Sequence, residues 1–305
     1  MPRDDGGLRG GHPRSHRREA RAAYLFTAPA FIFYFAFALV PVLATLVFSL
    51  TEIDRFTWDI SFIGLGNYID IWTDPLFWGS FARTFQFISM SVVGNVGLGL
   101  FVAVLLDRRM PPVLSYFLRF AYFMPVLVAT ALVSLIWQFI YSTDLGILNW
   151  YLHRLGLPRV GWLTDAHVAM ISVVMMDVWK HFGFFMIILL AGLQAVPRAQ
   201  LEAAALDGAG PWHLFVHIKL PTITPVLLFC ITYATIGGLQ VFDSVRILTN
   251  GGPGSATMVM VLYMYEQTFG AQNLGTGSAA ATMLLAAIGL VTAVQFRLGR
   301  SWVQK

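Results

Sequence analysis

"EAAALDGAGPWHLFVHIKLP", residues 202–221, is a stretch of mixed polarity, rich in alanine and glycine, that separates two long apolar runs. The chain around it is 57% hydrophobic and only 12% charged, with a mean hydropathy of +0.68. Soluble globular domains do not carry so apolar a composition over 305 residues. The stretch is therefore predicted to be a polar connection in an integral membrane protein.

On both sides of this stretch the chain contains runs of about 18 or more mostly apolar residues, each long enough to cross a bilayer. There are six, at residues 23–50, 81–106, 116–141, 167–190, 221–242 and 277–298. The first resembles a signal peptide in its flanking arginines and its A-x-A tripeptide, but it is longer than a signal core and the tripeptide precedes most of it. The sequence thus predicts an all-α integral membrane protein with six transmembrane helices, the first of them retained. The apolar residues 258–269 are too few to form a seventh span.

Basic residues are unevenly distributed between the connections. The N-terminal tail, the second and fourth connections and the C-terminal tail hold 14 of the 20 Lys and Arg residues, and the other connections hold 4. Because these residues accumulate on the cytoplasmic side, both termini are predicted to be cytoplasmic. This distribution also explains the net charge of +4 without nucleic-acid binding. The predicted domains are a disordered basic tail (1–22), the membrane domain (23–298) and a short cytoplasmic tail (299–305).

The opening stretch is predicted to form two short helices around a break. Residues 198–206 are compatible with a helix, residues 207–211 contain two glycines and a proline, and residues 212–219 can form a second helix before Pro221 opens the fifth run. The small residues would allow another backbone to approach closely, which favours a docking element. The alternative is an interfacial helix that lies on the lipid surface.

The sequence Glu202-Ala203-Ala204, followed by Gly208, nine further residues and Ile218-x-Leu220-Pro221, resembles the EAA motif of membrane subunits of binding-protein-dependent ABC importers. The similarity continues in "MPV" (124–126), "VWK" (178–180), "LLAGLQAVP" (189–197) and "FDSVRILTNGGPGSAT" (242–257). It extends from about residue 24 to 298 and is closest to the sugar-transport branch, of maltose type and glycerol-phosphate type.

This resemblance implies the type I ABC importer permease fold and a location in a bacterial-type inner (plasma) membrane. It also implies three kinds of partner: a second homologous permease subunit, two cytoplasmic ATP-binding subunits and an extracytoplasmic solute-binding protein. In the family, the loop that corresponds to residues 197–221 docks into a cleft on the ATPase subunit. The coupling residues carried over by motif are Glu202, Ala203, Ala204, Asp207, Gly208, Ala209, Leu220 and Pro221.

The sequence contains none of the common motifs for nucleotide binding, hydrolysis or metal binding that we considered. The chain has no G-x-x-x-x-G-K-[ST] motif, and the glycine-rich residues 250–257 lack its lysine. It has no nucleophile elbow or H-E-x-x-H, and its one cysteine, Cys230, cannot form a metal cluster. We therefore expect a transport subunit rather than an enzyme, with no cofactor or metal of its own. ATP and Mg would be bound by the partner ATPase subunits.

Three ionisable residues, Asp177, Lys180 and His181, fall inside the fourth run. At about 1.5 Å rise per residue, Asp177 is expected roughly 15 Å from the start of this run, near the middle of the bilayer. Charged groups at that depth are costly and are candidate functional residues. Asp177, His181 and Phe184 share one helix face through their i, i+4, i+7 spacing. Alternatively, Asp177 and Lys180 neutralise each other at i, i+3 and only hold the bundle together.

The resemblance to maltose-type importers implies a solute path midway through the membrane. The positions carried over to it, with one polar neighbour, are Val126, Thr130, Asp177, His181, Phe184, Gly238, Gln240 and Val241. The ionisable groups leave the solute open between a disaccharide, an amino sugar, a polyol and a glycerophosphodiester. The alternative function is a stand-alone secondary transporter or channel that uses Asp177, Lys180 and His181 as a proton relay. The EAA motif favours the importer, because a stand-alone carrier needs no docking loop for an ATPase.

Overall fold

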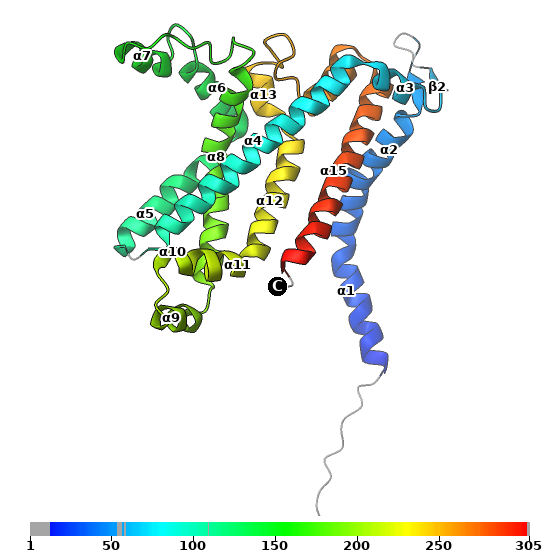
Figure 1. Cartoon of the computed structure of the whole chain (residues 1–305). Coiled ribbons are helices and arrows are strands. Elements are labelled where there is room, and N and C mark those ends of the chain that lie inside the picture. Colours follow the sequence, from blue (N-terminus) through cyan, green and yellow to red (C-terminus); the bar gives the residue numbers. More distant parts are fainter. Residues whose placement is uncertain (1–12, 54–56, 58, 109, 304–305) are drawn as a thin grey trace, which may run out of the picture.

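The computed structural model describes residues 13–53, 57, 59–108 and 110–303, which form a bundle of long helices with shorter helices at both ends (Figure 1). In chain order the elements are α1 (Pro13–Tyr34), η1 (Phe35–Leu39), α2 (Val40–Phe48), β1 (Thr51–Ile53), β2 (Ile60–Phe62), α3 (Gly66–Thr73), α4 (Pro75–Leu106), α5 (Pro112–Phe123), η2 (Met124–Leu127), α6 (Thr130–Ile140), α7 (Ile147–Arg154), α8 (Ala169–Gln194), α9 (Arg198–Leu206), α10 (Pro211–Leu214), η3 (Phe215–Lys219), α11 (Leu220–Thr222), α12 (Thr224–Leu239), α13 (Asp243–Leu248), α14 (Met260–Tyr265), η4 (Glu266–Gly270) and α15 (Leu274–Val303). The η2 element is a 3₁₀ turn, and η1, η3 and η4 are π-helical turns.

Among the described residues, four helical stretches are long and apolar enough to span a bilayer. They are Ala23–Phe48, Pro75–Leu106, Ala169–Gln194 and Leu274–Gly299. The number rises to six if each of two bent helix pairs is one span, which agrees with the six spans that the sequence predicts. The short α14, together with η4, is not among the candidate spans, as its length predicts.

The third span differs from the continuous helix that the sequence predicts, whereas the bend before the fifth span lies near the predicted junction with the second short helix. Pro112–Leu127 and Thr130–Ile140 meet at an angle of 98°, and Pro211–Thr222 and Thr224–Leu239 meet at 67°. In the third span Pro125 lacks the N–H that an α-helix needs, and Val128 takes an extended conformation with ψ 139°. Apolar composition alone predicts a span but not the break within it.

The two ends of the chain also differ from prediction. Helix α1 begins at Pro13, so residues 13–22 are helical rather than a disordered tail, whereas residues 1–12 lie outside the described part. Arg, Glu and Ala are strong helix formers and proline is tolerated in the first turn, which explains the early start. Helix α15 continues to Val303, beyond the predicted end of the span at residue 298.

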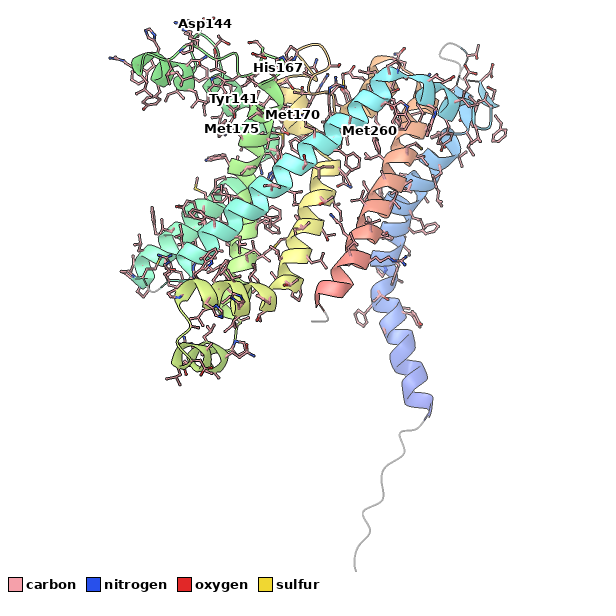
Figure 2. All side chains as sticks on the ribbon, in the orientation of Figure 1. Tyr141, Asp144, His167, Met170, Met175 and Met260 are labelled. Carbon is pink, nitrogen blue, oxygen red and sulfur yellow. The ribbon has the colours of Figure 1, made fainter. Side chains whose placement is uncertain are left out.

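Helices α4 and α8 form the centre of the bundle and approach each other closely at a glycine. A Cβ atom on Gly99 would lie 3.0 Å from Cβ of Phe185 and 3.1 Å from the backbone nitrogen of Met186. Small residues at such crossings let two membrane helices pack backbone to backbone. At one end of α8 the hydroxyl of the buried Tyr141 donates to the carbonyl oxygen of Ser172 at 2.8 Å, and Figure 2 shows this ring beside the helix.

The regions that are rich in basic residues lie at one end of the bundle. Figure 1 shows α9, α10, the start of α1 and the end of α15 toward the same end, and α3, α7, α13 and the β1–β2 hairpin at the other. The antiparallel hairpin pairs Thr51 with Phe62 and Ile53 with Ile60. The fold therefore separates two sets of connections, as an alternating membrane topology requires.

Candidate functional site

A cavity of about 300 Å³ lies between α4, α8 and α12, beside the η2 turn. The residues that line it are Ser91, Asn95, Val126, Asp177, His181, Phe184, Phe185, Tyr233, Ala234, Gly237 and Gly238. Five of the residues predicted for the solute path are thus brought together, from three separate regions of the chain. A largely apolar cavity with a few convergent polar groups is the usual form of a small-molecule site.

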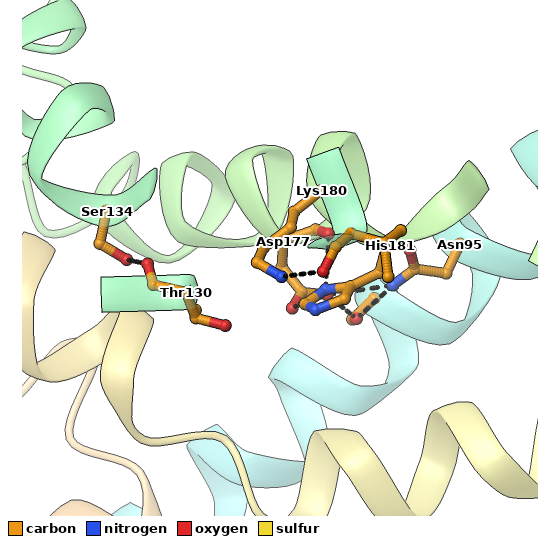
Figure 3. Close-up of polar contacts among 8 residues, drawn as sticks. Asn95, Thr130, Ser134, Asp177, Lys180 and His181 are labelled. Carbon is orange, nitrogen blue, oxygen red and sulfur yellow. Dashed lines mark hydrogen bonds and ion pairs between the residues drawn. The ribbon is translucent and has the colours of Figure 1, made fainter. Parts of the chain in front are cut away.

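Asp177 is the centre of a hydrogen-bonded network on one wall of this cavity (Figure 3). Its Oδ2 accepts from Oγ of Ser91 at 2.6 Å and from Nδ2 of Asn95 at 3.0 Å, both of them on α4. Its Oδ1 lies 3.0 Å from Nδ1 of His181, one turn further along α8. Three donors therefore surround one carboxylate, which offsets part of the cost of placing this charge among apolar helices.

Lys180 lies three residues after Asp177 but contacts a different partner. Its side chain is buried, and its Nζ lies 3.4 Å from the backbone carbonyl oxygen of Val126. Val126 belongs to η2, at the break in the third span, where carbonyl groups lack helical partners. No ion pair joins Asp177 and Lys180 among the described residues, so their mutual neutralisation, predicted as the alternative, is replaced by an ammonium–carbonyl contact.

Another part of the cavity lining is aromatic. The ring centroid of Phe184 lies 5.1 Å from that of Tyr233 on α12 and 5.4 Å from that of Phe185. These rings provide an apolar surface against which the face of a sugar ring can lie. Polar groups and aromatic rings in one cavity would fix both the position and the orientation of a solute.

Three residues predicted for the solute path do not line the cavity. Thr130 is the first residue of α6 beyond the break, Gln240 caps the end of α12, and Val241 packs with an apolar cluster elsewhere in the bundle. Sequence analysis missed Ser91 and Asn95, which hold Asp177. The sequence contains a pattern that could have indicated them, because Ser91 and Asn95 are polar residues at i, i+4 within an apolar run and so share one helix face.

The coupling segment, residues 197–221, has the predicted form of two short helices around a glycine turn. At the end of α9 the N–H of Gly208 donates to the carbonyl oxygen of Ala205 at 3.1 Å, and that of Ala209 donates to Ala204 at 3.0 Å. These two bonds form a Schellman motif, in which the residue after the helix cap has a positive φ. Gly208 has a φ of +86°, which side chains other than glycine rarely adopt. Gly208 therefore sets the direction in which the chain leaves α9.

A hollow of about 480 Å³ lies between α9 and α10. Its lining residues are Ala204, Asp207, Gly208, Ala209, Gly210, His213 and Ile218. Four of the eight predicted coupling residues thus line one surface. Glu202 and Ala203 are exposed on α9, and Leu220 and Pro221 lie in α11, outside the hollow.

An ion pair attaches the coupling segment to the membrane helices. Nζ of Lys219, in η3, lies 2.5 Å from Oδ2 of Asp107, the residue that caps the C-terminus of α4. Both side chains are largely buried. Because Ser91 and Asn95 lie on α4 as well, one helix contacts both the coupling segment and the Asp177 network. Among the described residues, no group of three or more His, Cys, Asp or Glu side chains could hold a metal ion.

Removal of the Lys180 ammonium should destabilise the bundle. We expect Lys180→Met to lower the free energy of unfolding by about 1–3 kcal/mol, because the Val126 carbonyl then loses its donor in an apolar environment. Lys180→Arg keeps a charged donor, so its free energy of unfolding should decrease less than that of Lys180→Met. The measurement is the thermal stability of the purified protein in detergent. Unchanged stability in Lys180→Met would mean that the break in the third span does not need this contact.

A bundle of apolar spans around a largely apolar cavity with a few polar groups, and with a short helix pair at one end, is the arrangement expected of a membrane transport protein. Residues 95–303 match the family model described as the binding-protein-dependent transport system inner membrane component. The chain belongs to this family and is a multi-pass permease subunit of an ABC importer. The alternative, a stand-alone secondary transporter, is therefore not adopted.

Permease proteins that are named for a sugar resemble the chain over nearly its whole length. The trehalose/maltose transport system permease protein MalF of Thermococcus litoralis is 35% identical over 283 residues, which are 93% of this chain and 95% of that protein. The lactose transport system permease protein LacF of Rhizobium radiobacter is 33% identical over 279 residues, 90% of this chain and 91% of that one. A bacterial alginate ABC transporter, solved with an alginate pentasaccharide-bound periplasmic protein, has the same fold, with a TM-score of 0.85 at 18% identity over 97% of this chain and 99% of the other.

Proposed function

We propose that this chain forms, with a second membrane chain, the path through which an ABC importer carries a carbohydrate or a related solute across the membrane. The observation that carries the proposal is the cavity between α4, α8 and α12, whose lining includes both Asp177 and Phe184. Relatives named for trehalose/maltose and lactose transport support a carbohydrate. A solute-binding protein outside the membrane would deliver it, as the description of the family and the alginate complex suggest.

The coupling segment is proposed to connect ATP hydrolysis to this path. It presents small residues around an open hollow, and the Lys219–Asp107 ion pair fixes it to the end of α4. A rotation of this segment by a docked ATPase would therefore displace α4 and, with it, Ser91 and Asn95. ATP and Mg would bind to two such ATPase subunits and not to this chain.

The second membrane chain has apolar surface available to it. In the most apolar window of the first span, Ala23–Phe48, no residue is buried by the rest of the chain. Helices α1 and α2 are therefore free to contact lipid or the partner subunit on their outer faces.

The proposed function is tested with the complete complex. This chain, its partner permease, the ATPase subunits and the solute-binding protein are purified together and placed in proteoliposomes. Addition of the binding protein loaded with its solute should stimulate ATP hydrolysis several-fold and produce uptake. Failure of every trehalose-, maltose- and lactose-type solute to do so would contradict the assignment to carbohydrate import.

The orientation is proposed from the bias of basic residues, with both termini and the coupling segment in the cytoplasm. Leu155, after α7, and Leu206, in α9, are 73% and 89% exposed and lie at opposite ends of the bundle. Leu155→Cys should react with an impermeant thiol reagent in intact cells, and Leu206→Cys only after lysis. The native Cys230 is buried and serves as the unlabelled background. The reverse pattern would invert the proposed topology.

A further inference from the structure

The polar wall of the cavity consists of Ser91, Asn95, Asp177 and His181, and its hydrogen-bond donors bind to acceptors within the protein. Oγ of Ser91 and Nδ2 of Asn95 both donate to Oδ2 of Asp177, and Nδ1 of His181 lies 3.0 Å from Oδ1. Nδ2 of Asn95 also donates to Oγ of Ser91 at 3.0 Å. A carboxylate has about four lone-pair positions, so these three donors leave roughly one free. The groups on this wall that remain for a solute are therefore acceptors.

The other polar atoms on this wall are acceptors as well. Oδ1 of Asn95 is an acceptor with no hydrogen-bond partner among the described residues, but this atom is itself buried, so it gives the cavity neither a donor nor an accessible acceptor. Nδ1 of His181 also lies 3.0 Å from the carbonyl oxygen of Asp177, so this nitrogen carries the ring proton and Nε2 is an acceptor in the neutral ring. A second proton on His181 would only cancel the charge of Asp177. In neither protonation state does the wall have a net positive charge.

The nearby Lys180 does not make the charge of this wall positive. Lys180 is buried, does not line the cavity, and directs its ammonium group to the carbonyl oxygen of Val126 (Figure 3). Among the described lining residues, only Asp177 and His181 can carry charge near neutral pH. Lys180 thus adds no positive charge to the lining of the cavity, whereas the Asp177 side chain is part of that lining.

We propose that this wall selects the solute by charge. It binds a carbohydrate that presents hydroxyl or ammonium groups to Asp177, and it rejects one that presents a carboxylate, sulfate or phosphate group there. Two like charges a few ångströms apart repel strongly in a poorly solvated cavity, whereas a hydroxyl or ammonium donor meets a free acceptor. The proposal rests on the proposed function as a carbohydrate permease. Of the solutes that the sequence left open, it excludes the glycerophosphodiester and favours the disaccharide, the amino sugar or the polyol.

The test measures binding to the assembled membrane complex without the solute-binding protein, whose own selectivity would otherwise mask that of the cavity. Three disaccharides of similar size serve as probes in saturation-transfer NMR: lactose, the diamino disaccharide of glucosamine, and digalacturonate. We expect lactose and the diamino sugar to bind at least about 10-fold more tightly than digalacturonate. In Asp177→Asn the difference between the cationic and the anionic probe should shrink to about 3-fold or less.

A second variant keeps the carboxylate and changes only its donors. Ser91→Ala frees a lone pair of Asp177, so the preference for the diamino sugar should be retained or widened. Equal binding of digalacturonate and lactose to the unmodified complex would overturn the charge selection and leave carbohydrate transport intact. An unchanged preference in Asp177→Asn, or a narrower one in Ser91→Ala, would overturn it too. Absence of binding by all three probes, in a complex that also fails the uptake assay above, would overturn the proposed function itself.

Discussion

Replacement of Gly208 by valine should abolish most solute-stimulated ATP hydrolysis and uptake, whereas the same replacement at Gly210, which lines the same hollow, should reduce both much less. No atom lies within 4 Å of a Cβ added at either position, so space does not distinguish them. Backbone conformation does, because Gly208 has a φ of +86° and Gly210 has φ −71° and ψ 167°. Valine adopts the second conformation readily and the first hardly at all.

The expected size of this effect follows from the cost of a left-handed conformation. An L-residue at positive φ loses about 1–2 kcal/mol, and a β-branched residue loses more. A correctly formed turn at the end of α9 then becomes roughly 5- to 30-fold less populated. The measurements are co-purification of the ATPase subunit and stimulation of its activity. The membrane helices should remain inserted, because the coupling segment is exposed at the end of the bundle.

A third variant separates the effect of backbone conformation from the effect of side-chain size. Asparagine is similar in size to valine but tolerates a positive φ, so Gly208→Asn should retain more coupling than Gly208→Val. Equal loss in these two variants would mean that the surface near Gly208 must be bare for a docking partner, and that the turn itself is not limiting. Full coupling in Gly208→Val would refute a role of the Schellman motif.

Local signals predicted the coupling segment well. The sequence predicted a helix over residues 198–206 and a glycine break after it, and the structure has α9 at Arg198–Leu206 with Gly208 in the left-handed region. A helix end of this kind is decided by a few neighbouring residues, so the sequence contains the necessary information. The role of this segment in docking an ATPase stays a prediction.

The break in the third span and the partners of Asp177 depend on contacts between distant parts of the chain. Apolar residues continue across residues 116–141, so hydropathy predicts one helix, although Pro125 marks the place where it bends. The bend is compatible with a membrane because Lys180, more than 50 residues later, donates to a freed carbonyl group. Likewise, Ser91 and Asn95 contact Asp177 only because α4 crosses α8 in one particular register. Neither register nor crossing angle can be derived from composition.

Asp177→Asn should reduce uptake by roughly 10- to 100-fold while the complex still assembles and hydrolyses ATP. Hydrogen bonds to charged groups contribute about 1.5–3 kcal/mol each, and the solute would lose one such bond. Asparagine keeps the shape of the side chain, and its Oδ1 can still accept from Ser91 and Asn95. His181 can accept from the new Nδ2 if its ring proton moves to Nε2, at the cost of the hydrogen bond from Nδ1 to the carbonyl oxygen of residue 177. The bonds to Ser91 and Asn95 are therefore retained, and the charge of the side chain that lines the cavity is lost.

Comparison with Asp177→Ala separates a solute-binding role from a structural one. Alanine leaves the Ser91 hydroxyl without its acceptor and removes one of the two acceptors of Asn95 and of His181, at about 1–3 kcal/mol for an unpaired buried group, so less folded complex should be recovered. Asp144→Asn is a matched control, because this carboxylate is exposed, forms a surface ion pair with Arg159 at 3.1 Å, and lies far from the cavity. If Asp177 only held the bundle together through Lys180, Asp177→Asn would leave an unpaired buried ammonium and reduce the yield of folded complex as well. Normal yield with reduced uptake in Asp177→Asn, and reduced yield in Asp177→Ala, would place Asp177 in the solute path, whereas normal uptake in Asp177→Asn would assign that path to other residues.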